Sequence, residues 1–165
     1  MLEVEGTSKI PSGERVSTLL HRLFGKPVDY SYSKPVKTVP WLRIGVAVYC
    51  YEDDTIAFLG LADLNFSSRA GSALTLIPAN VADQAIIQQK LSNHMFRNLY
   101  EVFNSLGMLL NDQHKEPVYL KALHLGSRMD LPDSLRELVK TNQSNVDLDL
   151  HISGYGDGRL TIMAA

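Results

Sequence analysis

The sequence predicts an α+β domain: a largely antiparallel sheet with a long helix packed across it and additional short helices. Two observations lead to this prediction. Segments with a period of two residues occur in pairs separated by turns, as in β-hairpins. A long helical pattern from about residue 80 to residue 110 lies between those pairs. The 165 residues, 45% of them hydrophobic, are enough for one domain over 1–165 with a substantial core.

The N-terminal part is expected to be a lead-in over 1–12, followed by a helix and an arm. The stretch "SGERVSTLLHRLFGK" has apolar residues at helical spacing, and Gly25 is a typical helix end. Residues 26–40 contain three prolines, which favour an extended arm or a long loop over a helix: Pro27, Pro35 and Pro40. Residues 1–40 are therefore expected to form an N-terminal helix and a proline-containing arm.

A β-hairpin is predicted next. In "RIGVAVYCY" alternate residues share one face: Ile44, Val46, Val48 and Cys50. "EDDT" is a turn, and "TIAFLGLADL" is the returning strand, with Asp63 expected to act as a local cap where the strand ends.

Helices follow the hairpin. Ser67 or Ser68 is expected to cap a short helix that continues to about Leu76, with Pro78 ending it. The long helical pattern over 80–110 comes next, with a break predicted near residues 92–93.

The C-terminal third is expected to hold three strands and a short helix. "PVYLKALHL" and "VDLDLHIS" are predicted strands, and "PDSLRELVKT" is a predicted helix with Pro132 near its start. "GYGDGR" is interpreted as a turn in which the pair Asp157-Gly158 forms a tight hairpin. "LTIMA" is the last predicted strand.

Composition argues against several classes of function. The net charge is −2 and no basic stripe occurs, so neither nucleic acid nor an anionic membrane is an expected partner. No uninterrupted apolar run of about 18 residues occurs, and the N-terminus lacks a signal-peptide pattern, so a cytoplasmic protein is expected. The single cysteine, Cys50, lies in an apolar run and is expected to be a packed thiol.

Motifs for metal binding and nucleophilic catalysis are weak. The five histidines are scattered and show no metal-ligand spacing: His21, His94, His114, His124 and His151. His124 and His151 lie in predicted strands and could converge, although ordinary exposed or hydrogen-bonded histidines are the preferred interpretation. Asp53 and Asp54 could bind a hard cation, but a solvated turn explains them better. No metal and no cofactor are expected in this chain.

The segment "FRNLYEVFNSLGMLL" contains the candidate site. Its helical periodicity predicts a core-facing stripe of Phe96, Leu99, Phe103, Leu106 and Leu110, with Val102 and Leu109 at its side. Arg97, Glu101, Asn104 and Met108 form a different, exposed stripe, which places Glu101 and Asn104 one turn apart.

Glu101 and Asn104 have two interpretations. The carboxylate of Glu101 can pair with a lysine of a partner protein, and the carboxamide of Asn104 can hold a water molecule in a chosen direction. Phosphoryl transfer depends mainly on such positioning and on electrostatics. The other interpretation is an ordinary exposed polar face.

The segment "LADLNFSSRAGSALTLIPANVADQAI…LSNHMFRNLYEVFNSLGMLL" resembles the CheC/CheX-like chemotaxis phosphatase family, as a divergent CheC-like member, over about residues 41–165. "EVFN" carries the most specific part of the resemblance. The resemblance implies a phosphatase that removes the aspartyl phosphate of a response-regulator receiver domain (CheY-like). Glu101 would pair with the receiver's lysine and Asn104 would orient the attacking water as catalytic residues. Magnesium would be held by the receiver.

The chain departs from the family pattern around the motif. Arg97 stands where Asp or Ser is usual and could pair with Glu101, Met108 stands where glycine is common, and Pro117 comes early. No convincing second E-x-x-N pair is present. A non-catalytic interaction module of the same fold in two-component or chemotaxis signalling is therefore the second hypothesis.

Two further hypotheses concern other surfaces. The third hypothesis for the function is a sensor that binds a small molecule on the open face of the sheet. A homodimer is also considered, through exposed strand edges or the proline-rich arm.

Overall fold

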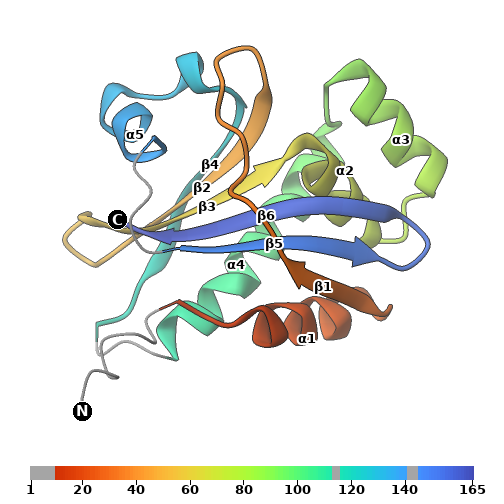
Figure 1. The fold of residues 1–165 in the computed structure, drawn as a ribbon, viewed down its shortest axis with the longest axis horizontal. Helices are drawn as coiled ribbons and strands as arrows, with labels where there is room; N and C mark the ends of the chain where they lie inside the picture. The colour runs from red at the N-terminus through yellow and green to blue at the C-terminus, as the bar shows by residue number, and fades with distance from the viewer. Residues whose placement is uncertain (1–9, 113–115, 141–144) are drawn as a thin grey trace.

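The computed structural model of the chain describes residues 10–112, 116–140 and 145–165 (Figure 1). The predicted lead-in lies largely outside these residues. The elements in chain order are α1 (Gly13–Phe24), β1 (Val28–Tyr32), β2 (Arg43–Cys50), β3 (Ile56–Asp63), α2 (Leu64–Ala73), α3 (Ala79–Gln88), α4 (Asn93–Asn111), β4 (Tyr119–Ser127), the 3₁₀ turn η2 (Arg128–Asp130), α5 (Asp133–Leu138), β5 (Asn145–Ile152) and β6 (Gly156–Ala164).

The strands form one six-stranded antiparallel sheet in the order β1-β5-β6-β3-β2-β4. The β2–β3 hairpin and the β5–β6 hairpin are the predicted ones, and β3 pairs with β6 to join them in the centre. The predicted α+β fold class is confirmed. None of the helices in the described part of the chain has both the length and the apolar character needed to span a membrane.

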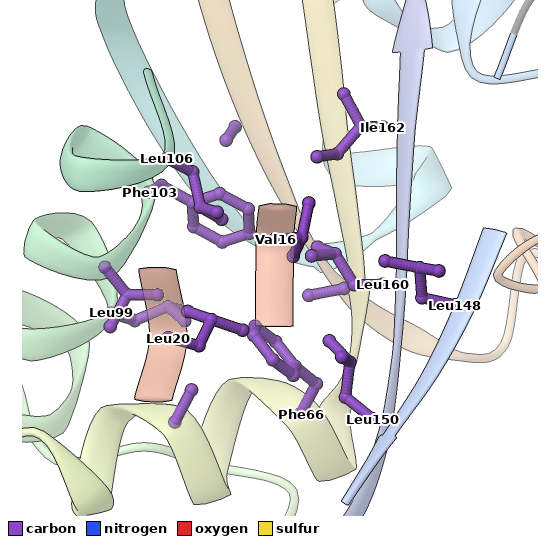
Figure 2. Packing of buried hydrophobic residues seen from close by; sticks show 14 of the residues in the cluster. Val16, Leu20, Phe66, Leu99, Phe103, Leu106, Leu148, Leu150, Leu160 and Ile162 are labelled. Carbon is purple, nitrogen blue, oxygen red and sulfur yellow. The ribbon is translucent and has the colours of Figure 1, made fainter. Parts of the chain in front are cut away.

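Helices α1, α2 and α4 cover one face of the sheet. Their core joins apolar side chains of α1 and α4 with those of β5 and β6; Figure 2 labels ten of the residues, among them Leu20, Phe103, Leu148 and Leu160. The opposite face holds a smaller cluster in which Leu135 of α5 and Val36 of the arm pack on the sheet. The alternate residues of β2 that were predicted to share a face all belong to this smaller cluster: Ile44, Val46, Val48 and Cys50.

The start of α2 differs from the prediction. The N-cap is Asp63, whose Oδ1 accepts a hydrogen bond from the Phe66 backbone N–H at 2.7 Å, as suits its expected role as a local cap. Ser67 and Ser68 are buried inside the helix and cap nothing. The predicted serine cap was wrong because β3 runs directly into α2 with no intervening loop.

The β5–β6 turn also differs from the prediction. It lies over residues 153–155, with positive φ at Gly154 and Gly156, whereas Asp157 and Gly158 belong to β6. A Cβ at residue 158 would stand 2.4 Å from the Phe66 Cα. The close approach of β6 to α2 therefore requires glycine at position 158. In a sequence, a glycine needed for close packing cannot be distinguished from a glycine needed for a turn.

The arm contains a strand that the sequence did not predict. Within 26–40, β1 pairs with β5, and only Val28 of its five residues is buried. With four exposed residues the strand shows no apolar alternation. The rest of the arm contains no helix, as expected, and is tied to the sheet where the Val36 N–H donates to Thr161 Oγ1 at 3.0 Å.

Candidate functional site

The candidate site lies on α4, whose boundaries follow from its sequence. The long helical pattern is divided into α3 and α4 as predicted, because Gln89 adopts a left-handed conformation and ends α3. The Ser92 side chain then caps α4 by accepting a hydrogen bond from the Met95 N–H at 3.1 Å. These two signals start a new helix of 19 residues.

The inner face of α4 fixes the helix on the sheet. Leu99 and Phe103 are fully buried, and the Phe103 ring occupies the space that a side chain at Gly60 of β3 would need, 2.9 Å from its Cβ position. The Tyr49 hydroxyl donates to the Phe103 backbone oxygen at 2.7 Å. Burial raises the pKa of Tyr49 far above its usual value, so this hydroxyl keeps its proton as a donor.

A second set of contacts fixes α4 against α2. A Cβ on Gly71 would stand 2.6 Å from the Met95 backbone oxygen, so the glycine allows the two helices to approach closely. The Asn98 carboxamide, 6% exposed, donates to the Gly71 backbone oxygen and to Thr75 Oγ1, both at 2.8 Å. The helix is therefore held on two sides by buried contacts.

The outer face of α4 carries the predicted exposed stripe. Arg97, Glu101, Asn104 and Met108 are all exposed. Within the described ranges, Glu101 and Asn104 make no side-chain hydrogen bond or ion pair. The ion pair considered between Arg97 and Glu101 is likewise not formed among these residues. The carboxylate and the carboxamide are thus both free to contact another molecule, one helical turn apart.

A depression of about 420 Å³ lies between the start of α4 and β4. Half-buried Phe96, Leu123 and Leu125 line it together with polar residues, and no residue of the exposed stripe does. The neighbouring Tyr100 hydroxyl donates to the Leu120 backbone oxygen at 3.4 Å. The helical pattern placed Phe96 in the core stripe, but it is only half-buried, because β4 is an edge strand and leaves this side of α4 partly uncovered.

The other candidate residues are not brought together. His124 lies on β4 and His151 on β5, with β6, β3 and β2 between them, so they do not converge. No group of three or more potential metal-ligating side chains (His, Cys, Asp or Glu) occurs among the residues that the structure describes. His114 lies outside those residues.

Asp53, Asp54 and Cys50 have structural explanations. Asp53 Oδ1 accepts a hydrogen bond from the Thr55 N–H at 3.0 Å, which lowers the pKa of Asp53, and Asp54 pairs with Lys121 at 2.9 Å. This is the arrangement of a solvated turn.

Cys50 is 4% exposed, and burial raises the pKa of its thiol, which opposes formation of a reactive thiolate.

Comparison with known proteins identifies the fold. No protein-family model and no curated protein sequence matches the chain significantly. The structure is similar to the FliM middle domain from H. pylori (TM-score 0.59, 8% identity, covering 96% of this chain and 86% of that one). It is also similar to the FliG–FliM complex from H. pylori (0.57, 11%, 96% and 90%).

A third similar structure is the CheX–CheY–BeF3–Mg²⁺ complex from Borrelia burgdorferi (TM-score 0.50, 7% identity, 92% of this chain and 93% of that one). At these identities the likeness establishes a common fold. The resemblance to the CheC/CheX-like family inferred from the sequence is confirmed at the level of the fold.

Proposed function

We propose that this chain is a chemotaxis-type signalling protein whose α4 outer stripe acts on a CheY-like response-regulator receiver domain and hydrolyses its aspartyl phosphate. One observation carries the proposal. Glu101 and Asn104 are exposed, one turn apart and without a partner among the described residues, on a helix that buried contacts hold on two sides. A rigid base lowers the cost of aligning polar groups with a partner's reactive centre.

The roles of the two residues follow the family resemblance. Glu101 pairs with the active-site lysine of the receiver and fixes the orientation of the two proteins. Asn104 accepts from and donates to the attacking water and directs it at phosphorus; a neutral carboxamide does not remove its proton. The water oxygen forms a bond to phosphorus while the bond to the aspartyl oxygen breaks. The proton passes to phosphate, and the receiver regains its carboxylate, with magnesium held by the receiver.

A second surface near the same helix is the depression between the start of α4 and β4, where Phe96, Leu123 and Leu125 are half-buried. None of the lining residues belongs to the exposed stripe, so a partner that acts on Glu101 would reach this depression only by extending over the first turns of α4. Protein interfaces gain affinity chiefly from such apolar contacts, while charged groups at the rim set orientation.

A non-catalytic interaction module is the second candidate function. Arg97 and Met108 depart from the family pattern on both sides of Glu101 and Asn104 and share their exposed stripe. The fold also occurs in a FliG–FliM complex from H. pylori. In this alternative α4 binds a partner protein and leaves its phosphate untouched.

The proposal places the protein in the cytoplasm, where a receiver domain would be met. A homodimer through a strand edge or the arm stays a prediction. The strands at the two edges of the described sheet are β1 and β4.

The test measures phosphate loss from CheY-like receiver domains labelled by a small phosphodonor. The full chain is compared with Glu101→Ala, Asn104→Ala and, as a control, His21→Ala on the exposed side of α1. The proposal expects faster phosphate loss with the wild type and the control, and loss of that acceleration in the two α4 variants with folding unchanged. Binding of the receiver without acceleration would establish the non-catalytic module, and neither binding nor acceleration across a broad receiver panel would overturn both functions.

A further inference from the structure

A groove lies where the arm passes the end of the sheet, at the start of β2 and the end of β3. Its lining includes four apolar residues, which are Val36 and Leu42 from the arm, Ile44 from β2 and Leu64 from the start of α2. The other lining residues are polar or charged, Asn65 and Gln89 among them. The hydrogen bond from the Val36 N–H to Thr161 Oγ1 fixes the arm on the sheet, so the side of the groove that the arm forms is preformed. The groove, here called the arm groove, shares no residue with the exposed stripe of α4.

Two cationic side chains of the arm groove have no ion-pair partner among residues 10–112, 116–140 and 145–165. Arg43, at the start of β2, is half-buried, and its Nε is buried with no hydrogen-bond partner in the described part of the chain. Lys37 of the arm is exposed and forms no ion pair with any described residue. A buried guanidinium nitrogen without an acceptor is costly, so an anion in the groove would relieve that cost.

The remaining charged residues of the groove are already engaged. The Arg159 guanidinium donates to Asp149 at 2.9 Å. Asp63 Oδ1 accepts from the backbone N–H groups of Phe66 and Arg159, at 2.7 and 3.0 Å. Asp63 is the one carboxyl group of the lining, while Lys37 and Arg43 are its two positive side chains without an ion-pair partner among the described residues, so positive charge is in excess.

The volume limits the ligand to a small molecule. The groove has a volume of about 260 Å³. This is slightly below the usual range of ligand pockets, about 300–1,000 Å³. Four apolar residues and an excess of positive charge suit a molecule with a compact apolar body and one carboxylate.

We propose that the arm groove binds a small carboxylate with an apolar body, with its carboxylate at Arg43 and Lys37 and its body against Val36, Leu42, Ile44 and Leu64. Arg43 offers a planar pair of donors that matches a carboxylate, and Lys37 adds a second positive charge. This site is independent of the action proposed for α4, because neither residue belongs to that helix.

The experiment titrates the full-length protein with benzoate and follows backbone amide chemical shifts and the melting temperature. Matched probes are benzyl alcohol, which keeps the ring and lacks the charge, and inorganic phosphate, which keeps the charge and lacks the ring. The variants are Arg43→Gln and Lys37→Gln. Arg22→Gln, on the exposed side of α1, is the control with the same change of charge.

The proposal expects saturable benzoate binding with shifts at residues of the groove and a raised melting temperature. Arg43→Gln should weaken benzoate about tenfold to a hundredfold, the usual worth of a charge-assisted hydrogen bond, and Arg22→Gln should leave it unchanged. If Arg43→Gln fails to fold, Lys37→Gln, at an exposed position of the arm, carries the same test. Absence of saturable benzoate binding, equal binding of benzyl alcohol or phosphate, or wild-type binding by the folded groove variants would overturn it.

Discussion

Two asparagines of α4, six positions apart, show how differently the two sides of one helix are used. Asn98 is 6% exposed and donates one hydrogen bond to Gly71 of α2 and one to Thr75 just after that helix. Asn104 is exposed and has no hydrogen-bond partner among the described residues. The same side chain thus serves the fold at one position and is left free at the other. Substitutions on the inner face of α4 should therefore change the stability of the protein, whereas substitutions on its outer face should change only the proposed action on a partner.

The largest expected effect lies on the inner face. Phe103→Ala should lower the free energy of unfolding by about 3–5 kcal/mol, because it removes a fully buried ring that fills the space beside Gly60. Chemical denaturation measures the change, and Met108→Ala, at an exposed position of the same helix, is the control. Equal midpoints for the two variants would contradict the assignment of the two faces.

Asn98→Ala should cost about 1–3 kcal/mol, because it leaves the buried carbonyl of Gly71 without its donor. Asn104→Ala should stay within about 0.5 kcal/mol of the wild type. The pair of unfolding curves sharpens the comparison directly. A stability loss at Asn104 as large as that at Asn98 would show that the outer face also holds the fold.

Tyr49→Phe should cost about 1 kcal/mol at neutral pH through loss of its hydrogen bond to Phe103. Burial raises the pKa of Tyr49 above its ordinary value of 10.0, so above that pH the unfolded chain releases a proton that the folded chain retains. Stability therefore falls as pH rises through 10, by up to about 1.4 kcal/mol per pH unit from this group. Unfolding measured between about pH 9 and pH 11 should show a shallower decline in Tyr49→Phe; parallel declines would place the hydroxyl in solvent.

The smallest effect is expected between Arg97 and Glu101. The two side chains form no ion pair in the described structure, so a double-mutant cycle with alanine at both positions should give a coupling energy below about 0.5 kcal/mol. The measurement is the same denaturant titration on four proteins. A clearly larger coupling would mean that Arg97 occupies the Glu101 carboxylate and competes with a partner's lysine.

Periodicity predicted which side chains share a face. The common face of alternate residues in β2 and the outer stripe of α4 could be read from the sequence, because side chains alternate along a strand and recur every 3.6 residues along a helix. The break near Ser92 could be read as well. Contacts between distant segments could not be read from the sequence. Asp63 of β3 also accepts a hydrogen bond from the Arg159 N–H of β6, and β1 is a strand because β5 pairs with it.

The candidate site was predictable to the same extent and for the same reason. Helical spacing placed Glu101 and Asn104 on one exposed face, and the structure places both side chains there. Helical spacing did not predict the depression between α4 and β4. Phe96 and Leu123 line it together only because β4 lies at the edge of the sheet. The arm groove was equally hidden, because Lys37, Arg43 and Leu64 lie on three separate elements.

The most direct test of the account compares the two asparagines in one assay. Phosphate loss from a CheY-like receiver is measured with wild type, Asn98→Ala and Asn104→Ala, at a temperature where circular dichroism shows all three folded. The account predicts that Asn98→Ala retains the acceleration while melting earlier, and that Asn104→Ala loses the acceleration while melting with the wild type. Acceleration that persists in folded Asn104→Ala would contradict the central claim that the outer face of α4 performs the reaction.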